Sequence, residues 1–331
     1  MTFERSLIDR VQIERFLLLA GALAAGLIDA LAREEPASAA AVAAAAEADP
    51  RATYLVLEAL VAEGLVERVE EEKAGGRPDL PGSGLYRLTA TAKEHLLPQG
   101  ARVERYSILH QARKVRGWLE LPAVIKSGRP APRDPAHKDR TVMVKAMGER
   151  APEIVSEIVE RCLEYAGPIR TMVDIGGAVG HVAREFALHG VQATLFDRVE
   201  VLPHAREYLG SDAERIRLVG GDFTEALPAG VFDLVYFGNV HHIYSPLVAA
   251  RITREAFAIT APGGTIAIQE YVWGRSPRAA IFAVNMLQST EDGGVWTEEQ
   301  FRTWLVEAGF EEVVVLDLET NQTQLILGRK P

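Results

Sequence analysis

The chain of 331 residues contains one cysteine, Cys162, so it can form neither an intramolecular disulfide bond nor a cysteine-based zinc cluster. It has no run of about 18 uncharged apolar residues, the length that a membrane-spanning helix needs. Its first residues carry Glu4 and Asp9 and lack the apolar stretch of a secretory signal. We therefore expect a cytoplasmic protein with no membrane partner.

Basic residues are fewer than acidic residues. The chain has 36 lysines and arginines against 46 aspartates and glutamates, a formal net charge of -10. An acidic surface repels a phosphate backbone, so we expect no nucleic-acid partner. Hydrophobic residues make up 48% of the chain, which is normal for a globular protein, and its length predicts two domains.

The N-terminal part is predicted to be mainly helical. Apolar residues recur at helical spacing over residues 6–32, which predicts one helix. Residues 36–97 have the pattern of a winged helix: a helix capped by Ser38, a second that starts at Asp49-Pro50, and two short strands separated by a loop rich in glycine and proline. We place the first domain at 1–100.

Residues 101–165 are predicted as a helical linker that contributes to a substrate pocket. From residue 166 to 331, short apolar strands alternate with helices, the pattern of an α/β doubly wound, Rossmann-like parallel sheet. The last two strands follow each other too closely for a helical crossover, so the final strand must be antiparallel. This region is the predicted catalytic domain.

A glycine-rich turn follows the first strand of this domain, in the run VDIGGAVG. Asp174, Gly176, Gly177 and Gly180 lie in it. Glycine lets the backbone turn sharply and approach a ligand, and the helix that follows offers free N–H groups. The spacing is not the Gly-x-Gly-x-x-Gly of a nicotinamide site. The alternative is a tight strand-to-helix turn that binds nothing.

Carboxylates follow the next two strands. Asp197 ends the second strand, where an acid is placed to accept hydrogen bonds from ribose hydroxyls. Asp222 follows the third strand, where it could accept from an adenine amino group while Phe223 packs on the ring. Each aspartate could instead be a helix cap, but three such features on successive strand ends favour one nucleotide-like ligand.

The runs DIGGAVG, LFD, GGDF, FDLVYFGNVHHIYSP and APGGTIAIQE together resemble the ordered motifs of class I S-adenosylmethionine-dependent methyltransferases. With the winged-helix half, nearly the whole chain resembles the small-molecule O-methyltransferases of plant phenolic and bacterial polyketide metabolism. The resemblance implies S-adenosyl-L-methionine as cofactor and a homodimer formed by the N-terminal domain. It implies that the cofactor is held by Asp174, Gly176, Gly177, Gly180, Asp197, Arg198, Asp222, Phe223, Gly238 and Asn239.

Within that implied site, the glycine turn holds the methionine portion, Asp197 the ribose, and Asp222 with Phe223 the adenine. The lysine that the family has near the fourth strand is matched by Gly238 here, so the resemblance also implies that one cofactor contact is missing.

The resemblance places a catalytic histidine after the fourth strand. Aligning the family pattern on Ser245 matches this histidine to His242, and His241 is the alternative. A histidine, with an ordinary pKa of about 6.5, is neutral near pH 7 and can accept a phenol proton. Either histidine could instead be a packed or surface residue, and we expect one of the two to face the pocket.

The acid that orients the histidine in plant enzymes is matched by Val295 here. Glu291, Asp292 or Glu270 could replace it. Some bacterial relatives depend on proximity more than on a base, and others methylate carbon, so a C- or N-methyltransferase of the same fold remains an alternative.

The acceptor pocket is expected between the helices around residues 106–147 and 278–290. Methionine and aromatic side chains at helical spacing are more often plain core, but their apolar character favours an aromatic or polycyclic acceptor. The candidates by position are Tyr106, Trp118, Met143, Met147, Phe282, Asn285, Met286 and Gln288.

A winged helix also allows a different class of function, a DNA-binding regulator. Its recognition helix would be residues 50–63, where Arg51 is the one basic residue against Glu58 and Glu63. A DNA-reading helix normally has a basic face, so this hypothesis is disfavoured. No acid or histidine cluster has metal-ligand spacing, and we expect metal-independent activity.

Overall fold

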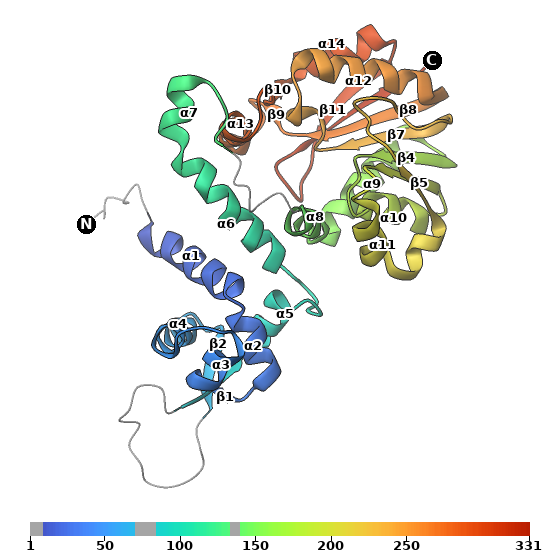
Figure 1. The fold of residues 1–331 in the computed structure, drawn as a ribbon. Helices are drawn as coiled ribbons and strands as arrows, with labels where there is room; N and C mark the ends of the chain where they lie inside the picture. The colour runs from blue at the N-terminus through green and yellow to red at the C-terminus, as the bar shows by residue number, and fades with distance from the viewer. Residues whose placement is uncertain (1–8, 70–83, 133–139) are drawn as a thin grey trace, which may run out of the picture. The chain divides into compact units, whose positions relative to one another are not determined.

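The computed structural model describes residues 9–69, 84–132 and 140–331 (Figure 1). The chain divides into two compact units, Met1–Lys114 and Val115–Pro331, and helix α6 (Arg105–Leu119) contains the division. The predicted loop between the two strands of the winged helix lies almost wholly outside the described residues.

The first unit is a small helical body around a three-stranded antiparallel sheet of order β1-β3-β2. Its buried core comes from every element, as Ile28, Val42, Leu57 and Tyr86 show. The elements are α1 (Arg10–Ala24), α2 (Leu27–Glu34), β1 (Ala37–Ser38), α3 (Ala39–Ala45), α4 (Pro50–Ala62), β2 (Val66–Val69), β3 (Leu85–Leu88) and α5 (Ala90–Leu96).

The predicted starts of two helices are confirmed. Ser38 Oγ accepts from Ala41 N at 3.2 Å, and Asp49 Oδ1 accepts from Ala52 N at 2.8 Å. The single helix predicted over residues 6–32 is wrong. The helix is interrupted at Gly26, whose φ of 72° is left-handed, and α1 and α2 meet at a bend of 62°.

The second unit contains a seven-stranded sheet of order β11-β12-β8-β7-β4-β5-β6. The central strands pair in parallel, and β12 is antiparallel to β8, so the predicted fold class and the antiparallel last strand are confirmed. The strands are β4 (Thr171–Ile175), β5 (Gln192–Asp197), β6 (Ile216–Gly220), β7 (Phe232–Gly238), β8 (Thr260–Glu270), β11 (Glu311–Asp317) and β12 (Gln324–Arg329).

Helices cover both faces of this sheet (Figure 1). One buried cluster joins α9 (Pro152–Ala166), α10 (His181–Leu188) and α11 (Leu202–Leu209) to the sheet, and a second joins α12 (Pro246–Ile259) and α14 (Glu298–Ala308) to its other face. The order of strands reverses between β4 and β7. Ligands of doubly wound sheets bind at the carboxyl ends of the strands beside such a reversal.

Four further elements belong to this unit. They are α8 (Thr141–Gly148), α13 (Pro277–Ser289), and a short parallel pair formed by β9 (Val272–Trp273) and β10 (Trp296–Thr297). Helix α7 (Leu121–Ser127) contacts α13. Sequence periodicity did not predict α7, β9 or β10, because each is too short to show a period.

Among the described residues, no single helix has both the length and the apolar composition of a membrane span. The pair α1 and α2 reaches both only when the two helices are taken together across their bend.

Candidate active site

The glycine turn after β4 has a backbone that few side chains tolerate. Gly176 and Gly180 have φ values of 70° and 81°, and Ala178 is also left-handed at 53°. A Cβ on Gly177 would overlap the Asp174 carboxylate and come within 2.5 Å of Leu195. The turn is therefore packed tightly on its own strand, and Gly180 starts α10 directly behind it.

Asp197 joins this turn to the end of β5. Its Oδ2 accepts from Ala178 N at 2.8 Å and its Oδ1 accepts from Arg198 N at 2.7 Å. Burial raises the pKa of this carboxyl, and the two N–H donors oppose that shift. Each carboxylate oxygen keeps a further lone pair, so the group is held in place and can still accept from a ligand.

Beside Asp197 lies a cavity of about 350 Å³ between the ends of β5 and β6. An ion pair borders it, with Arg198 Nη2 3.5 Å from Asp222 Oδ2. The other Asp222 oxygen accepts from the backbone N and hydroxyl of Thr224, and these bonds lower the Asp222 pKa. The cavity is lined by Arg198, Val199, Glu200, Gly221 and Asp222.

The Phe223 ring lies against the glycine turn, since a Cβ on Gly176 would be 3.4 Å from it and 3.1 Å from Val240. Tyr244 packs edge-on against Phe223 with ring centroids 5.7 Å apart. Tyr244 was not among the site residues predicted from the sequence. Together Phe223 and Tyr244 form an aromatic wall next to the carboxylates.

Sequence reasoning also missed a buried polar network around Gln269. Its Oε1 accepts from Arg150 Nη1 at 3.1 Å and from Tyr236 Oη at 2.8 Å, and its Nε2 donates to Thr323 Oγ1 at 2.9 Å. The backbone N of Asn239 donates to Gln269 O at 2.9 Å. The network therefore joins Arg150, two residues before α9, to the ends of β7 and β8 and to the loop between β11 and β12.

Gly238 and Asp174 border this network. A Cβ on Gly238 would lie 2.9 Å from the Tyr236 hydroxyl, so tyrosine occupies the space beside Gly238. Burial, and then the charge of Asp197, raises the Asp174 pKa to about 7, and Arg150 opposes the shift. Asp174 Oδ1 is buried and has no hydrogen-bond partner among the described residues. A buried carboxylate oxygen without a partner is costly, which marks this position as one that a ligand could complete.

His241 is fully buried in an aromatic cluster. Its ring lies 5.1 Å from Phe237 and 6.5 Å from Trp304, centroid to centroid. The Thr253 hydroxyl donates to Ala249 O, so it accepts from His241 Nε2, at 3.2 Å. His241 Nδ1 then has no proton and no partner among the described residues. His241 is a core residue in this structure, and its burial lowers its pKa to about 4.

His241 should make the protein acid-sensitive. The unfolded chain takes up this proton near pH 6.5 and the folded chain only near pH 4, so the group's stabilisation is complete above pH 6.5 and is lost as the pH falls toward 4. We expect His241→Phe to cost about 1 kcal/mol at neutral pH, through the lost Thr253 bond, and to remove about 2 kcal/mol of acid destabilisation by about pH 5. Urea unfolding of both proteins at the two pH values measures this, and parallel pH curves would contradict it.

His242 differs from its neighbour. Its Nδ1 lies 2.8 Å from Glu270 Oε2, and its backbone N donates to Glu270 Oε1 at 3.1 Å. Glu270 is 1% exposed, so this carboxylate is enclosed with its partner. Because the carboxylate accepts from Nδ1–H, the ring nitrogen Nε2 is left with a lone pair.

Glu270 is therefore the carboxylate that the structure places at His242. The other two acids considered in its place, Glu291 and Asp292, are exposed and no hydrogen bond joins either to His242. Val295, which matches the position of the plant acid, is buried.

Helix α13 brings acceptor candidates next to His242. The Phe282 ring packs edge-on against the imidazole at 4.8 Å and lies 4.5 Å from the Tyr271 ring. Asn285 and Gln288 are buried, and Gln288 Nε2 donates to Asn285 Oδ1 at 3.1 Å. Met286 is buried on the same helix.

The remaining acceptor candidates are not gathered at His242. Met143 packs with Val144, Val179 and Val201 beside the glycine turn, and Met147 is 43% exposed. Trp118 is half-buried near the end of α6. Tyr106 belongs to the first unit, where Arg105 lies over its ring.

Another cavity, about 540 Å³, lies elsewhere, along α9. Exposed acidic side chains line much of it, and the Glu157 carboxylate in it accepts from Glu319 N, Thr320 N and the Thr320 hydroxyl. Within the described ranges, no three histidine, cysteine or acidic side chains are grouped so that they could hold a metal ion.

Comparisons with known proteins match both parts of the chain. A family model described as an O-methyltransferase domain matches residues 132–311, and one described as an O-methyltransferase dimerisation domain matches residues 17–97. The tetracenomycin polyketide synthesis 8-O-methyl transferase of Streptomyces glaucescens is 26% identical, over 99% of this chain and 93% of its own. Acetylserotonin O-methyltransferase of Mus musculus is 27% identical, over 83% of this chain and 75% of its own.

Solved structures share the fold over the full length. PigF with SAH superimposes with a TM-score of 0.78 at 23% identity, covering 100% of both chains. Human N-acetylserotonin methyltransferase in complex with SAM gives 0.72 at 24% identity, covering 99% of both chains.

Proposed function

Because the chain belongs to the O-methyltransferase family, whose methyl donor is S-adenosyl-L-methionine, we propose that it methylates a hydroxyl of a small aromatic or polyketide-like acceptor with His242 as the general base. The observation that supports the proposal is that the buried Glu270 carboxylate bonds both the backbone N and the ring Nδ1 of His242. An acceptor methylated on carbon or nitrogen mainly by proximity would not need this pair.

The residues around the glycine turn fit the cofactor. The close packing at Gly177, the fixed Asp197 carboxylate with free lone pairs, and the unpartnered Asp174 oxygen all suit a polar ligand at the ends of β4 and β5. When bound, S-adenosyl-L-methionine supplies a methyl group that its sulfonium has already activated. Asp197 would then accept from the ribose hydroxyls, and Gly176 with its neighbours would hold the methionine portion.

The second half of the cofactor suits the cavity beside Asp222. This carboxylate would accept from the adenine amino group, and Phe223 would pack against the ring. Arg150, which acts electrostatically on Asp174, would offer its positive charge to the methionine carboxylate. We expect Gly238 to contribute backbone contact alone.

His242 would remove the proton from the acceptor hydroxyl. Glu270 holds the ring by Nδ1–H, so Nε2 is the atom that takes the proton, and the enclosed carboxylate stabilises the imidazolium that results. The phenolate is the stronger nucleophile, and the remaining demand is its alignment with the methyl group. Phe282 keeps water from one side of the imidazole.

The acceptor would lie along α13, between Phe282, Asn285 and Met286. An apolar surface with a few buried amides suits a flat aromatic molecule that carries oxygen substituents. Two relatives act on acceptors of that kind according to their names, a tetracenomycin polyketide and 3-amino-4-hydroxybenzoate.

A homodimer formed by the N-terminal domain is part of the proposal. The chain has the family's dimerisation domain over residues 17–97. Apolar side chains on the first turns of α1, namely Val11, Ile13 and Leu17, are between 47% and 57% exposed in the single chain, which favours their burial by a second copy.

Transfer of labelled methyl from S-adenosyl-L-methionine to phenols tests the proposed function. We would use 3-amino-4-hydroxybenzoate, N-acetylserotonin and a hydroxyanthraquinone as probes, each with and without EDTA. We expect a methyl ether from at least one of them and a rate that EDTA does not change. Label on carbon or nitrogen would contradict the hydroxyl as acceptor, and activity lost in EDTA and restored by magnesium would contradict metal independence.

A further inference from the structure

Arg275 lies in the segment that connects the end of β8, which carries Glu270, to α13, which carries Phe282. Strand β8 ends at Glu270, which holds His242, and α13 begins at Pro277, five residues before Phe282. The turn passes through Gly274, whose φ of 83° is left-handed, and ends at Ser276, which caps α13 by accepting from Ala279 N. The direction in which α13 leaves the sheet is therefore set within six residues of the base-holding carboxylate.

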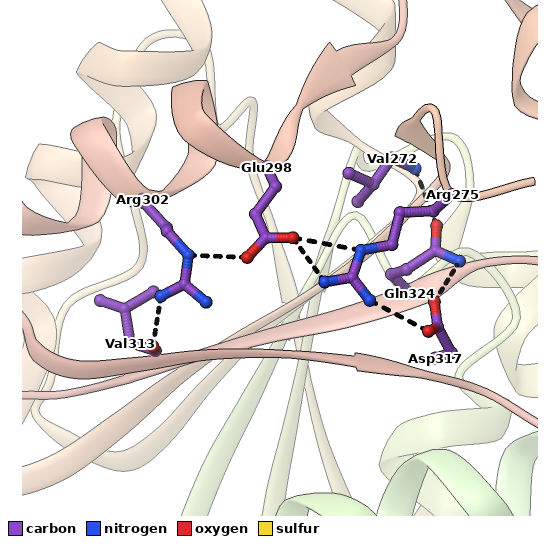
Figure 2. Close-up of polar contacts among 7 residues, drawn as sticks. All are labelled: Val272, Arg275, Glu298, Arg302, Val313, Asp317 and Gln324. Atoms are coloured by element: carbon purple, nitrogen blue, oxygen red, sulfur yellow. Dashed lines mark hydrogen bonds and ion pairs between the residues drawn. The ribbon is translucent and has the colours of Figure 1, made fainter.

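Figure 2 shows the guanidinium of Arg275 between two carboxylates that belong to other elements. Its Nε donates to Glu298 Oε2 of α14 at 3.1 Å, and Nη2 pairs with the same oxygen. Its Nη1 donates to Asp317 Oδ2 of β11 at 3.0 Å. Arg275 thus ties the turn to a helix and a strand of the sheet body.

The second oxygen of each of these carboxylates also accepts a hydrogen bond. Glu298 Oε1 accepts from Arg302 Nε at 2.8 Å, and Arg302 Nη1 donates to Val313 O at 2.6 Å (Figure 2). Asp317 Oδ1 accepts from Gln324 Nε2 at 3.0 Å. Two arginines thus face two acids, and the network is balanced in charge.

The network also returns to the turn. Gln324 Oε1 accepts from Val272 N at 2.9 Å, and Arg275 N donates to Val272 O at 3.2 Å. The turn is therefore fixed at both its strand end and its helix end by side chains of β11, β12 and α14. Gln324 is 2% exposed, which makes this second anchor a buried one.

We infer that Arg275 is a positioning residue that sets the placement of α13 against His242. The inference rests on the proposed function, because it gives α13 the acceptor side of the site. The Arg275 side chain is 27% exposed and that of Asp317 is 62% exposed, so these ion pairs contribute little to the stability of the whole unit. Their effect falls on the one segment that they anchor, and through Phe282 it reaches the imidazole.

Arg302→Gln is a matched control for Arg275→Gln. Both substitutions remove one arginine from the same Glu298 carboxylate, but the hydrogen bonds of Arg302 go to α14 and β11, so its loss leaves the turn anchored. Both would be made in the full chain, saturated with S-adenosylhomocysteine. Hydrogen exchange of residues 277–289 reports on α13, and the Hε1 resonance of ¹³C-labelled His242, assigned from His242→Ala, reports on the ring current of Phe282.

For Arg275→Gln we expect amide exchange in α13 to become about 3- to 10-fold faster and the His242 resonance to shift, with unchanged exchange in β4 and β5. For Arg302→Gln we expect neither change. Equal effects of the two substitutions, or an unshifted His242 resonance in Arg275→Gln, would overturn the inference. Should Arg275→Gln not fold, Asp317→Asn retains the Glu298 contact and must give a smaller shift in the same direction. The methyl-transfer assay fails or succeeds independently of these signals.

Discussion

Asp197→Ala should weaken binding of S-adenosylhomocysteine by about 100-fold or more. A ribose diol would lose two bonds to a charged acceptor, and such bonds contribute roughly 1.5–3 kcal/mol each. The substitution also frees Ala178 N, so the left-handed turn at residue 178 loses the bond that fixes it. Isothermal calorimetry with wild type and variant gives the affinity ratio directly.

Asp233→Ala is the matched control. Asp233 Oδ2 accepts two backbone N–H groups, from Arg170 at 2.9 Å and from Thr171 at 3.0 Å, much as Asp197 does, but at the amino end of the same sheet. We expect the two variants to lose similar thermal stability and Asp233→Ala to bind the ligand as wild type does. Equal affinities of wild type and Asp197→Ala would remove Asp197 from the cofactor site.

The features that the sequence predicted are local or follow from strand order. The caps at Ser38 and Asp49 depend on residues three positions apart, and the place of Asp197 follows from its position at the end of a strand. Parallel strands bring their carboxyl ends to one edge, so three separate motifs could be assigned to one site without any contact being known.

The features that the sequence left open depend on packing between distant segments. His241 and His242 are adjacent and chemically identical. They differ in their partners, since the ring of His241 packs among Phe237, Phe301 and Trp304. The ring of His242 bonds to Glu270 instead. Glu270 was one of three acids that could replace the missing plant carboxylate, 28 residues from His242. The break at Gly26 was hidden because the apolar period of α1 continues into α2.

His242→Ala should lower kcat for a phenol by about 10²- to 10⁴-fold, the usual contribution of a general base. Affinity for S-adenosylhomocysteine should not change, because Glu270 and the glycine turn lie on different strands and the Glu270 bond to the backbone N of residue 242 is retained. Initial rates with saturating S-adenosyl-L-methionine measure the loss. His241→Phe, which alters the adjacent imidazole, should turn over at a rate close to that of wild type.

The size of this loss should depend on the acidity of the acceptor. A nitrophenol that is already ionised at the assay pH needs no base, so His242→Ala should barely slow its methylation, whereas an ordinary phenol should show the full loss of kcat.

Glu270→Gln tests the carboxylate that orients His242, because it retains the imidazole and changes its hydrogen-bond partner. The glutamine amide can donate to Nδ1, which favours the tautomer with the proton on Nε2 and leaves no lone pair toward the acceptor. We therefore expect Glu270→Gln to lower kcat about 100-fold for the ordinary phenol and to leave the rate with the ionised phenol nearly unchanged.

For either variant, a loss of kcat of the same size with both phenols would contradict proton removal. His242 and Glu270 would then act in acceptor binding.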